Sequence, residues 1–319
     1  MSVLTILGKV LIFPGLLFTL LAALWLAGLD RKLVARMQRR VGPPLLQPWY
    51  DYLKCCGKET IIPRKANRTV FLAAPALGLA SIFVTAMLIP VGGVSIFSGS
   101  ADLVVILYLL TFASVMLIIG SAASGSPFAG VGLSREMVAM ISYELPFVLV
   151  MLAVGRAAGD GSCLAGVTFS LADLCAWQSA NGPMIFRWSL LPAAIAMLFI
   201  IPCEVGQQPF DIDEAETEIC EGVLAEYSGR PLGQFKMMHV IKMYVMSSLF
   251  CAMFLHIETG FLLADVVIHL VLCTLVCFVS MSLPHAITAR FKVEQIFRFY
   301  WTTVTALAAV SLILVWCGV

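Results

Sequence analysis

The chain consists of long apolar runs separated by polar segments. Eight runs are long enough to cross a bilayer, because a spanning helix needs about 20 mostly apolar residues. We predict membrane helices over 3–29, 69–91, 101–123, 137–154, 188–205, 237–257, 261–283 and 299–317. The runs are too long for the strands of a membrane barrel and lack its two-residue alternation. Because lipid requires backbone groups to pair internally, we expect an all-α integral membrane protein, a single membrane domain over 1–319 with long cytoplasmic loops.

Composition supports this prediction and excludes other classes. The 319 residues are 61% hydrophobic and 12% charged, whereas soluble domains are about 25% charged. Disordered chains show the opposite balance, with low hydrophobicity and high charge. The first run lacks the basic start and the cleavage site of a signal peptide, so we interpret it as a retained helix.

The basic residues indicate the orientation in the membrane. Sixteen of the 20 lysines and arginines fall in the segments 30–68, 124–136, 206–236 and 284–298. The alternate connections carry only Arg156 and Arg187. Since cytoplasmic loops are enriched in Lys and Arg, these four segments are predicted to lie inside, in a cell inner membrane, with both termini outside.

Motifs for redox, nucleotide or metal chemistry are not found in the sequence. The ten cysteines are scattered through apolar runs, without iron–sulfur or zinc spacing. The chain has no Walker loop and no G-x-G-x-x-G. We therefore predict no catalytic residue, no metal site and no cofactor on this chain, and no nucleic-acid partner.

The first inner loop, 30–68, combines a basic helical extension with a rigid turn. We predict that the first helix continues through Arg40 and ends at Gly42-Pro43-Pro44, because proline cannot continue a helix. A second short helix over 45–56 places Leu46, Trp49, Tyr50 and Leu53 on one stripe. Such a stripe suits the membrane interface or another subunit. The basic charge of 30–68, taken alone, would also fit an ordinary loop that touches lipid headgroups.

The third inner loop and the helix end before it are strongly acidic. Eight of the 19 acids lie within 204–226: Glu204, Asp211, Asp213, Glu214, Glu216, Glu218, Glu221 and Glu226. We predict a helix from about Asp211 that places Glu214, Glu218 and Glu221 on one face. Repulsion and burial would raise the pKa values of these carboxyl groups. A solvated acidic helix is the alternative, but interleaved apolar residues such as Phe210 and Ile219 favour partial burial.

A carboxyl group also lies inside a predicted span. Glu144 is in the run 137–154, followed by Pro146, and Glu136 lies at the inner end of the same run. An ionisable group within the membrane indicates a functional site by default, although it can also be paired for structure. Glu136, Glu144 and the eight acids of 204–226 therefore form a hypothetical proton or ion relay. A standalone transporter is less favoured, because the sequence lacks two matching broken-helix halves.

Two signatures resemble a known family. Arg39-Arg40-Val41-Gly42-Pro43-Pro44, with Gln47, Asp51 and Lys54, resembles the first-loop signature of the NuoH-type membrane subunits of complex I. The stretch from Pro209-Phe210-Asp211 to Tyr227-Ser228-Gly229, and Ser142-Tyr143-Glu144, resemble two further signatures of that family. The resemblance covers essentially the whole chain.

Departures from the family pattern indicate a branch. Respiratory complex I usually has an arginine facing the quinone cavity where this chain has Gln207, and a proline where it has Asp213. Gly125-Ser126-Pro127-Phe128 and Ser134-Arg135-Glu136 are similar to a segment of membrane-bound [NiFe]-hydrogenases of the Ech and formate hydrogenlyase types. The resemblance thus favours a non-catalytic, energy-converting hydrogenase subunit over a quinone-site subunit of NADH dehydrogenase.

The resemblance also implies partners. The chain would anchor a peripheral arm that holds a [NiFe] large subunit and a small iron–sulfur subunit, beside antiporter-like membrane subunits in the lipid bilayer. The [NiFe] centre and the iron–sulfur clusters would lie on those partners. Loops 30–68 and 206–236 would dock the arm, through Arg36, Arg39, Arg40, Gly42, Pro43, Pro44, Gln47, Asp51, Lys54 and Tyr227.

Overall fold

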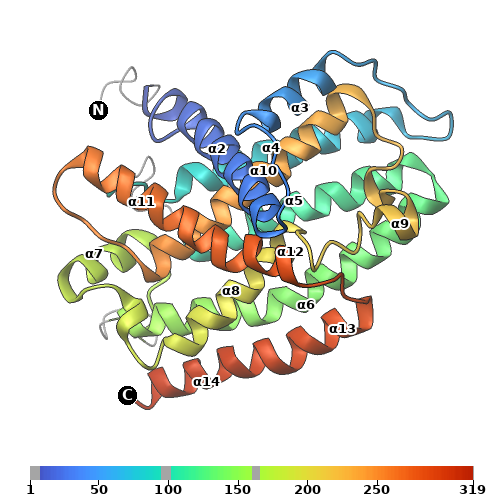
Figure 1. Cartoon of the computed structure of the whole chain (residues 1–319). Coiled ribbons are helices and arrows are strands. Elements are labelled where there is room, and N and C mark those ends of the chain that lie inside the picture. The colour runs from blue at the N-terminus through green and yellow to red at the C-terminus, as the bar shows by residue number, and fades with distance from the viewer. Residues whose placement is uncertain (1–7, 95–101, 160–165, 319) are drawn as a thin grey trace.

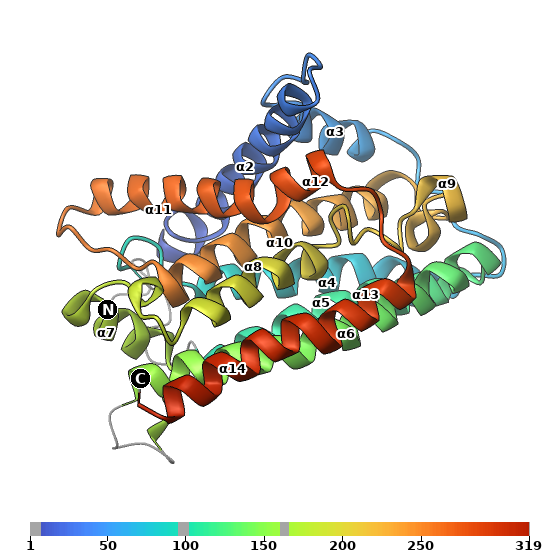
Figure 2. The ribbon, with the colours of Figure 1, turned by 60° about the horizontal axis from the view of Figure 1, so that its bottom comes forward.

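The structure is a computed structural model that describes residues 8–94, 102–159 and 166–318. Its architecture is a bundle of helices, and the described residues contain no β-strand beyond two isolated bridges, Val91–Val94 and Asp102–Ser170. The all-α prediction is therefore confirmed. The long helices run roughly along one direction between two ends, and we name these ends by the short helices they carry (Figure 2). The α3 end carries α3 (Gln47–Cys56) and α9 (Glu216–Ile219), and the α7 end carries α7 (Leu171–Asn181).

Seven helical stretches among the described residues are long and apolar enough to span a membrane. They are Gly8–Met37 (with α2, Leu16–Met37), α4 (Arg68–Leu88), α5 (Leu103–Ser124), α6 (Pro127–Ala158), α10 (Gly229–Phe254), Leu262–Ile287 (α11, η4 and α12) and Val293–Trp316 (α13, η5 and α14). The run predicted over 188–205 forms the shorter helix α8 (Leu191–Val205). This helix starts with a proline in its first turn and ends at Gly206 in the left-handed conformation. The count of eight spans thus remains a prediction.

Two boundary predictions were wrong. The segment 124–136, expected to be a loop, is mostly the start of the 32-residue helix α6, because Ser126 and Pro127 suit a helix N-terminus. The first helix does not continue through Arg40. It ends at Met37, because Arg39 takes a left-handed φ of 57° and the Arg40 amide bonds to the Ala35 carbonyl.

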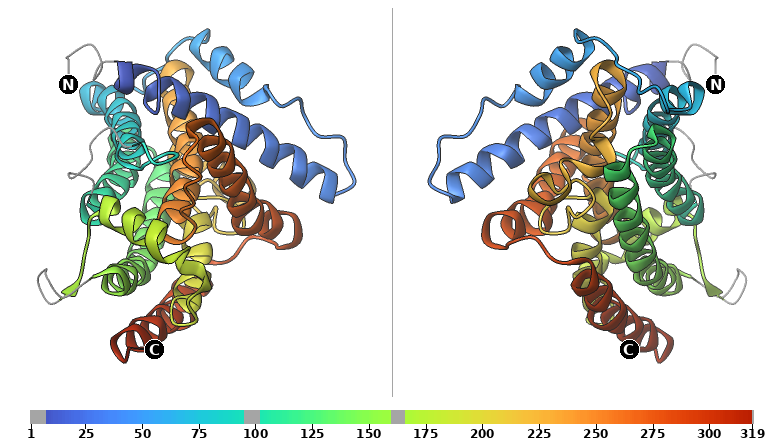
Figure 3. Two further views of the ribbon diagram at one scale, coloured as in Figure 1. Left: turned by 90° about the vertical axis from the view of Figure 1, so that its left-hand side faces the viewer. Right: turned by 90° about the vertical axis from the view of Figure 1, so that its right-hand side faces the viewer.

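Helix α10 is the centre of the bundle. Almost all of its residues beyond Phe235 are buried, and it packs against α2, α3, α4, α7, α8 and α11. Helices α2 and α3 project together from the body (Figure 3), whereas α13 and α14 lie along the opposite flank, against α6 and α8. The start of α2 and the end of α14 lie near the α7 end (Figure 1). Any polar group on the inward face of α10 is therefore held deep in the protein.

Candidate functional site: a buried acidic path

An ion pair is buried between α8 and α10. Lys242 Nζ lies 2.8 Å from Glu204 Oε1 and donates a hydrogen bond of 2.8 Å to Ser114 Oγ on α5. The Lys242 and Glu204 side chains are only 5% and 1% exposed. Ionisable groups at such depth are costly and mark functional sites. The pair is therefore the anchor of the candidate site.

Carboxyl groups from three elements converge beside this pair. A cavity of about 30 Å³ is lined by Glu136 of α6, Glu204 of α8, and Asp213 and Glu214 of the loop after α8, together with Lys242. Ser114 and His239 complete its polar wall. A cavity of this size has room for about two water molecules. Four carboxyl groups therefore line one small cavity together with the Lys242 side chain.

The loop after α8 reaches this depth because apolar anchors hold it. Phe210 is buried and lies against the rings of Phe291, Phe299 and Tyr300. The Phe291 amide donates to the Pro209 carbonyl at 3.1 Å. These contacts fix the backbone just before the acidic run, so that Asp211 to Glu214 follow in a set position.

Two arginines from other elements tie the acidic segment down. Arg290, between α12 and α13, pairs with Asp211 at 2.8 Å. Arg135 of α6 pairs with Glu218 at 2.7 Å and donates to the Ile212 carbonyl. These bonds link the segment to α6 and to the α12–α13 connection.

Burial sets the protonation of the carboxyl groups in this loop. It raises the pKa of Asp213 well above its ordinary value, and the neighbouring Glu136 and Glu214 add to the effect. Burial and the carboxylates of Asp211 and Glu136 raise the pKa of Glu214 to about 8. Glu214 is thus poised to take up or release a proton near neutral pH.

The predicted acidic helix from Asp211 was wrong. The segment is irregular up to Ala215, and α9 covers only Glu216–Ile219. Cys220 and Glu221 adopt left-handed φ values of 52° and 64°, so Glu214, Glu218 and Glu221 share no helix face. The reason is close packing, since a Cβ on Gly222 would lie 2.1 Å from the Asp213 carbonyl oxygen. Packing of the chain around Gly222, not helical spacing, therefore sets where these acids lie.

The remaining predicted relay residues occupy different places. Asp211, Glu214 and Glu221 line a second cavity, of about 230 Å³, with Lys236 and Arg290. Glu218 is exposed at the Arg135 pair, and Glu226 is half-buried. The Glu216 side chain lies outside the described part of the chain. Glu144 is half-buried on the flank of α6, between the exposed side chains of Ile141 and Leu145.

The first loop forms the outer wall of the site. Its predicted short helix is present as α3, and Leu46, Tyr50 and Leu53 are exposed on it. Arg31 pairs with Asp51 at 2.8 Å, and Gln47 donates to the same carboxylate. Burial alone would raise the pKa of Asp51, but the bonds from Arg31 and Gln47 outweigh it and lower the pKa.

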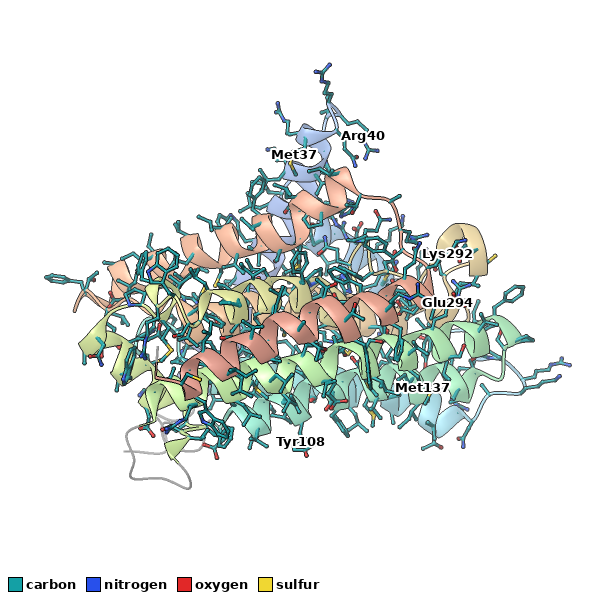
Figure 4. All side chains as sticks on the ribbon, turned by 90° about the horizontal axis from the view of Figure 1, so that it is seen from below. Met37, Arg40, Tyr108, Met137, Lys292 and Glu294 are labelled. Atoms are coloured by element: carbon teal, nitrogen blue, oxygen red, sulfur yellow. The ribbon has the colours of Figure 1, made fainter. Side chains whose placement is uncertain are left out.

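The predicted docking residues divide into exposed and buried groups. Arg36, Arg39, Arg40, Pro44 and Lys54 are exposed, and Figure 4 shows Arg40 pointing away from the body at the tip of α2. Gly42, Pro43, Gln47 and Asp51 are partly covered. Tyr227 is buried and stacks on Phe71 at 4.1 Å, so it holds the fold and offers no surface to a partner.

A larger cavity connects this loop with the acidic path. It has about 470 Å³ and lies between α2, α3 and α10, with Arg31, Lys54, Lys58 and Lys236 on its wall. It shares Glu214, Phe235 and His239 with the cavity beside Glu204. The three cavities therefore adjoin, from the α3 surface to the buried ion pair, and Glu214 lines all of them.

Sequence reasoning missed Lys242, His239 and Asp30 as site residues. Lys242 falls inside the predicted span 237–257, and a lysine in a span carries the same signal as Glu144. Asp30 was counted in the first loop, but it is buried in α2, bonded by Gln207 and Ser282.

Comparison with known proteins places this arrangement in a family. A family model described as NADH dehydrogenase matches residues 10–316. The chain belongs to the NADH dehydrogenase family. One member, a subunit of the NADH-quinone oxidoreductase of Thermomicrobium roseum, is 34% identical over 307 residues, which cover 89% of this chain and 87% of that protein. The NuoH-like resemblance is therefore confirmed.

The NADH dehydrogenase family extends beyond quinone-linked complexes. Hydrogenase-4 component C of Escherichia coli is 33% identical over 281 residues, covering 86% of this chain and 85% of that protein. A chain in the structure of an archaeal membrane-bound sulfane sulfur reductase superposes with a TM-score of 0.89 at 28% identity, covering 98% and 99% of the two chains. The protein is thus a multi-span membrane subunit of a complex I-like or hydrogenase-like assembly, and it has partner subunits.

Proposed function

We propose that this chain is the membrane-anchor and ion-coupling subunit of a membrane-bound [NiFe]-hydrogenase complex. It joins a peripheral electron-transfer arm to the membrane arm, and its buried acids relay protons between them. The [NiFe] large subunit and the small iron–sulfur subunit carry the metal centres. The α3 end faces the cytoplasm, and both termini face the opposite side of the inner membrane.

The observation that carries this proposal is the continuity of the acidic path. Glu214 lines the cavity under α3 and also the cavity that holds Glu136, Glu204 and Lys242. A charge that arrives at the α3 surface therefore acts on Glu214, whose pKa of about 8 lies close to neutral pH. Its field shifts the proton on Glu214, and the proton on the next carboxyl group follows. Glu144, on the flank of α6, faces the place where an antiporter-like subunit would continue the relay.

The exposed basic tip and the α3 stripe suit docking. Arg36, Arg39 and Arg40 stand clear of the bundle, beside exposed Leu46 and Tyr50. Charges of this kind guide association and orientation more than they add affinity. The hydrogenase branch is supported by the 33% identity to hydrogenase-4 component C and by Gln207 at the position of the quinone-site arginine.

The test uses the complex purified through a tag on this chain. Its subunits are identified by mass spectrometry, and hydrogen evolution from reduced methyl viologen is measured with proton uptake into inverted vesicles. Glu136→Gln, Glu144→Gln and Asp211→Asn should keep assembly and lower the protons moved per hydrogen formed. Glu294→Gln, at an exposed carboxyl outside the path, is the matched control. If all three variants retain the wild-type ratio, the relay is wrong.

A quinone-site subunit of NADH dehydrogenase is the second candidate. The cavity of about 470 Å³ between α2, α3 and α10 favours it, because small-molecule sites have this size. This candidate predicts quinone reduction by the purified complex and inhibition by quinone-site compounds. A complex with a [NiFe] subunit and without quinone reductase activity would exclude it.

A further inference from the structure

A second set of polar groups, most of them buried, lies on the face that α11 turns toward α2 and α10. From the α7 end toward the α3 end, Leu262–Ile287 carries Asp265, His269, Cys273, Cys277, Ser282 and His285. At 1.5 Å per residue, positions 265 to 285 extend over about 30 Å, which is the thickness of the hydrocarbon core. We call this set, with its partners on α2 and α10, the α11 seam.

The α3 end of the seam is centred on Asp30 of α2. Its carboxylate accepts hydrogen bonds from Ser282 Oγ at 2.5 Å and from Gln207 Nε2 at 2.9 Å. Gln207 Nε2 also lies 3.4 Å from His285 Nδ1. Asp30 is only 5% exposed, and its direct hydrogen-bond donors are neutral. Gln207 follows Gly206, which lines the acidic cavity, so the two systems meet here.

The α7 half of the seam is centred on His269. Its Nε2 lies 2.9 Å from Ser248 Oγ on α10 and 3.4 Å from Cys273 Sγ. Cys273 Sγ lies in turn 3.8 Å from Cys251 Sγ on α10. His269 is 8% exposed, so a titratable ring is held inside the bundle. A histidine can accept a proton on one ring nitrogen and release one from the other.

The middle of the seam joins these two groups. Cys277 follows Cys273 by one helical turn, and its thiol contacts the Ser282 hydroxyl and lies in the field of Asp30. The backbone here forms the π-helical turn η4 (Phe278–Ser282), and Ser280 Oγ bonds to the Val276 carbonyl. Such turns are rare, and they occur frequently at functional sites. The α-helical bonding is thus altered where the two halves of the seam meet.

The α7 end of the seam opens toward solvent through His256. This histidine follows α10 and interacts electrostatically with His269. Its Nε2 lies 2.9 Å from the carboxylate of Glu258, which is 43% exposed. Both residues line a cavity of about 470 Å³ that Lys9 also lines.

The end of α10 is fixed at this mouth. The Gln178 amide on α7 donates to the Ala252 and Met253 carbonyls and accepts from the His256 amide. These bonds fix the backbone at His256, a residue that lines the cavity.

We propose that the α11 seam is a proton route across the bilayer, from the Asp30 cluster to the His256–Glu258 mouth. A proton on the Asp30 carboxyl passes by way of Ser282 and the cysteine row to His269, and the His269 ring releases a proton from its other nitrogen toward His256. Glu258 receives it and passes it to solvent. Each group returns to its starting protonation state, so the net change is the transfer of one proton. The route rests on the proposed function, because it gives the relayed protons an exit through this chain.

The charged groups around the seam are few and lie at its ends. Arg31 and His285 face Asp30 at the α3 end, and Asp265, Glu258 and Lys9 lie at the α7 end. The described residues place no charged side chain at the midpoint, where Cys273 and Cys251 meet.

Proton flow through the resting complex tests this route without an electron donor. The purified complex is placed in liposomes that contain a pH-sensitive dye, and a potassium diffusion potential is imposed with valinomycin. Wild-type vesicles should take up protons faster than protein-free vesicles. Ser282→Ala and His269→Phe remove groups of the route, and Ser248→Ala removes the hydroxyl group bonded to the His269 ring, so all three should bring uptake toward the protein-free rate. Thr274→Val, which removes a hydroxyl group on α11 bonded only to its own helix, is the matched control and should behave as wild type.

The outcomes separate this route from the acidic path. Wild-type uptake equal to that of protein-free vesicles, or unchanged uptake in all three seam variants, overturns the route. The two serine variants remove a single oxygen each, so they keep the test valid if His269→Phe prevents assembly. Glu136→Gln should leave the seam in place, since it lies on α6, and its effect on the protons moved per hydrogen tests the acidic path alone.

Discussion

The Lys242–Glu204 pair allows a quantitative test of the site. In Lys242→Met the ammonium group is lost, while the Glu204 carboxylate remains 1% exposed beside α10. Breaking a buried pair by removing one partner costs about 3–5 kcal/mol, because the other charge is left uncompensated. At about 1.4 kcal/mol per tenfold, the ratio of folded to unfolded protein would fall by two to four orders of magnitude. Ser114 would also lose its partner at 2.8 Å, which adds to the loss.

The double variant separates charge from packing. Glu204→Gln with Lys242→Met removes both charges and keeps similar volumes, so it should be more stable than Lys242→Met alone. The assay is an SDS titration of the purified chain in mixed micelles, followed by the fluorescence of its six tryptophans. Arg187→Met, at an exposed cation near the α7 end, is the control. If Lys242→Met unfolds at the wild-type midpoint, or if the double variant is no more stable than Lys242→Met, the buried pair does not act as described.

Other parts of the site make shorter predictions. In the folded state the pKa of Glu214 is about 8, above the value in the unfolded chain, so the folded state binds more protons between these two pKa values. The free energy of unfolding should therefore fall as the pH rises toward 8. Glu214→Gln should flatten this pH dependence in unfolding midpoints measured from pH 5 to 9. Arg290→Gln should break the 2.8 Å ion pair with Asp211 and speed the hydrogen exchange of the backbone amides in 206–215. Lys292→Gln, at an exposed side chain, is the control and should leave this exchange unchanged. Tyr227→Phe keeps the ring stacked on Phe71 and loses one hydrogen bond of 3.3 Å, so it should lower the free energy of unfolding by about 1 kcal/mol. Tyr227→Ala loses the ring as well and should lower it by about 3–5 kcal/mol. Equal losses in the two variants would contradict this division between ring stacking and hydrogen bonding.

Hydropathy predicted the fold well because the spanning helices follow from length and composition alone. The same reasoning leaves the span at α8 a prediction, because Pro192 and Gly206 limit that helix, and it was wrong at the start of α6, where a segment expected to be a loop is helical. Helical spacing predicted a shared face for Glu214, Glu218 and Glu221. The chain instead brings acids together through Phe210, Gly222 and the arginines of other elements.

Candidate residues were predicted where their chemistry is unusual for their surroundings. Glu136 and the acids after Glu204 belong to this class, and several of them do line connected cavities. Lys242 pairs with Glu204 and Ser114, and Asp30 with Gln207 and Ser282, on other helices or loops of the fold. No local pattern shows such a pairing, since it depends on how α2, α5, α8, α10 and α11 pack.

The shortness of α8 has an electrical consequence. Its 15 residues extend about 22 Å, less than the hydrocarbon core of about 30 Å, and the chain turns at Gly206 into the acidic loop. Polar cavities thus extend from the α3 end into the depth that a full-length helix would fill. A membrane voltage then falls mainly across the apolar layer between Glu204 and the α7 end. A charge that moves through this thinner layer crosses a larger share of the potential per ångström. We therefore expect the short helix to concentrate the transmembrane field at the buried ion pair.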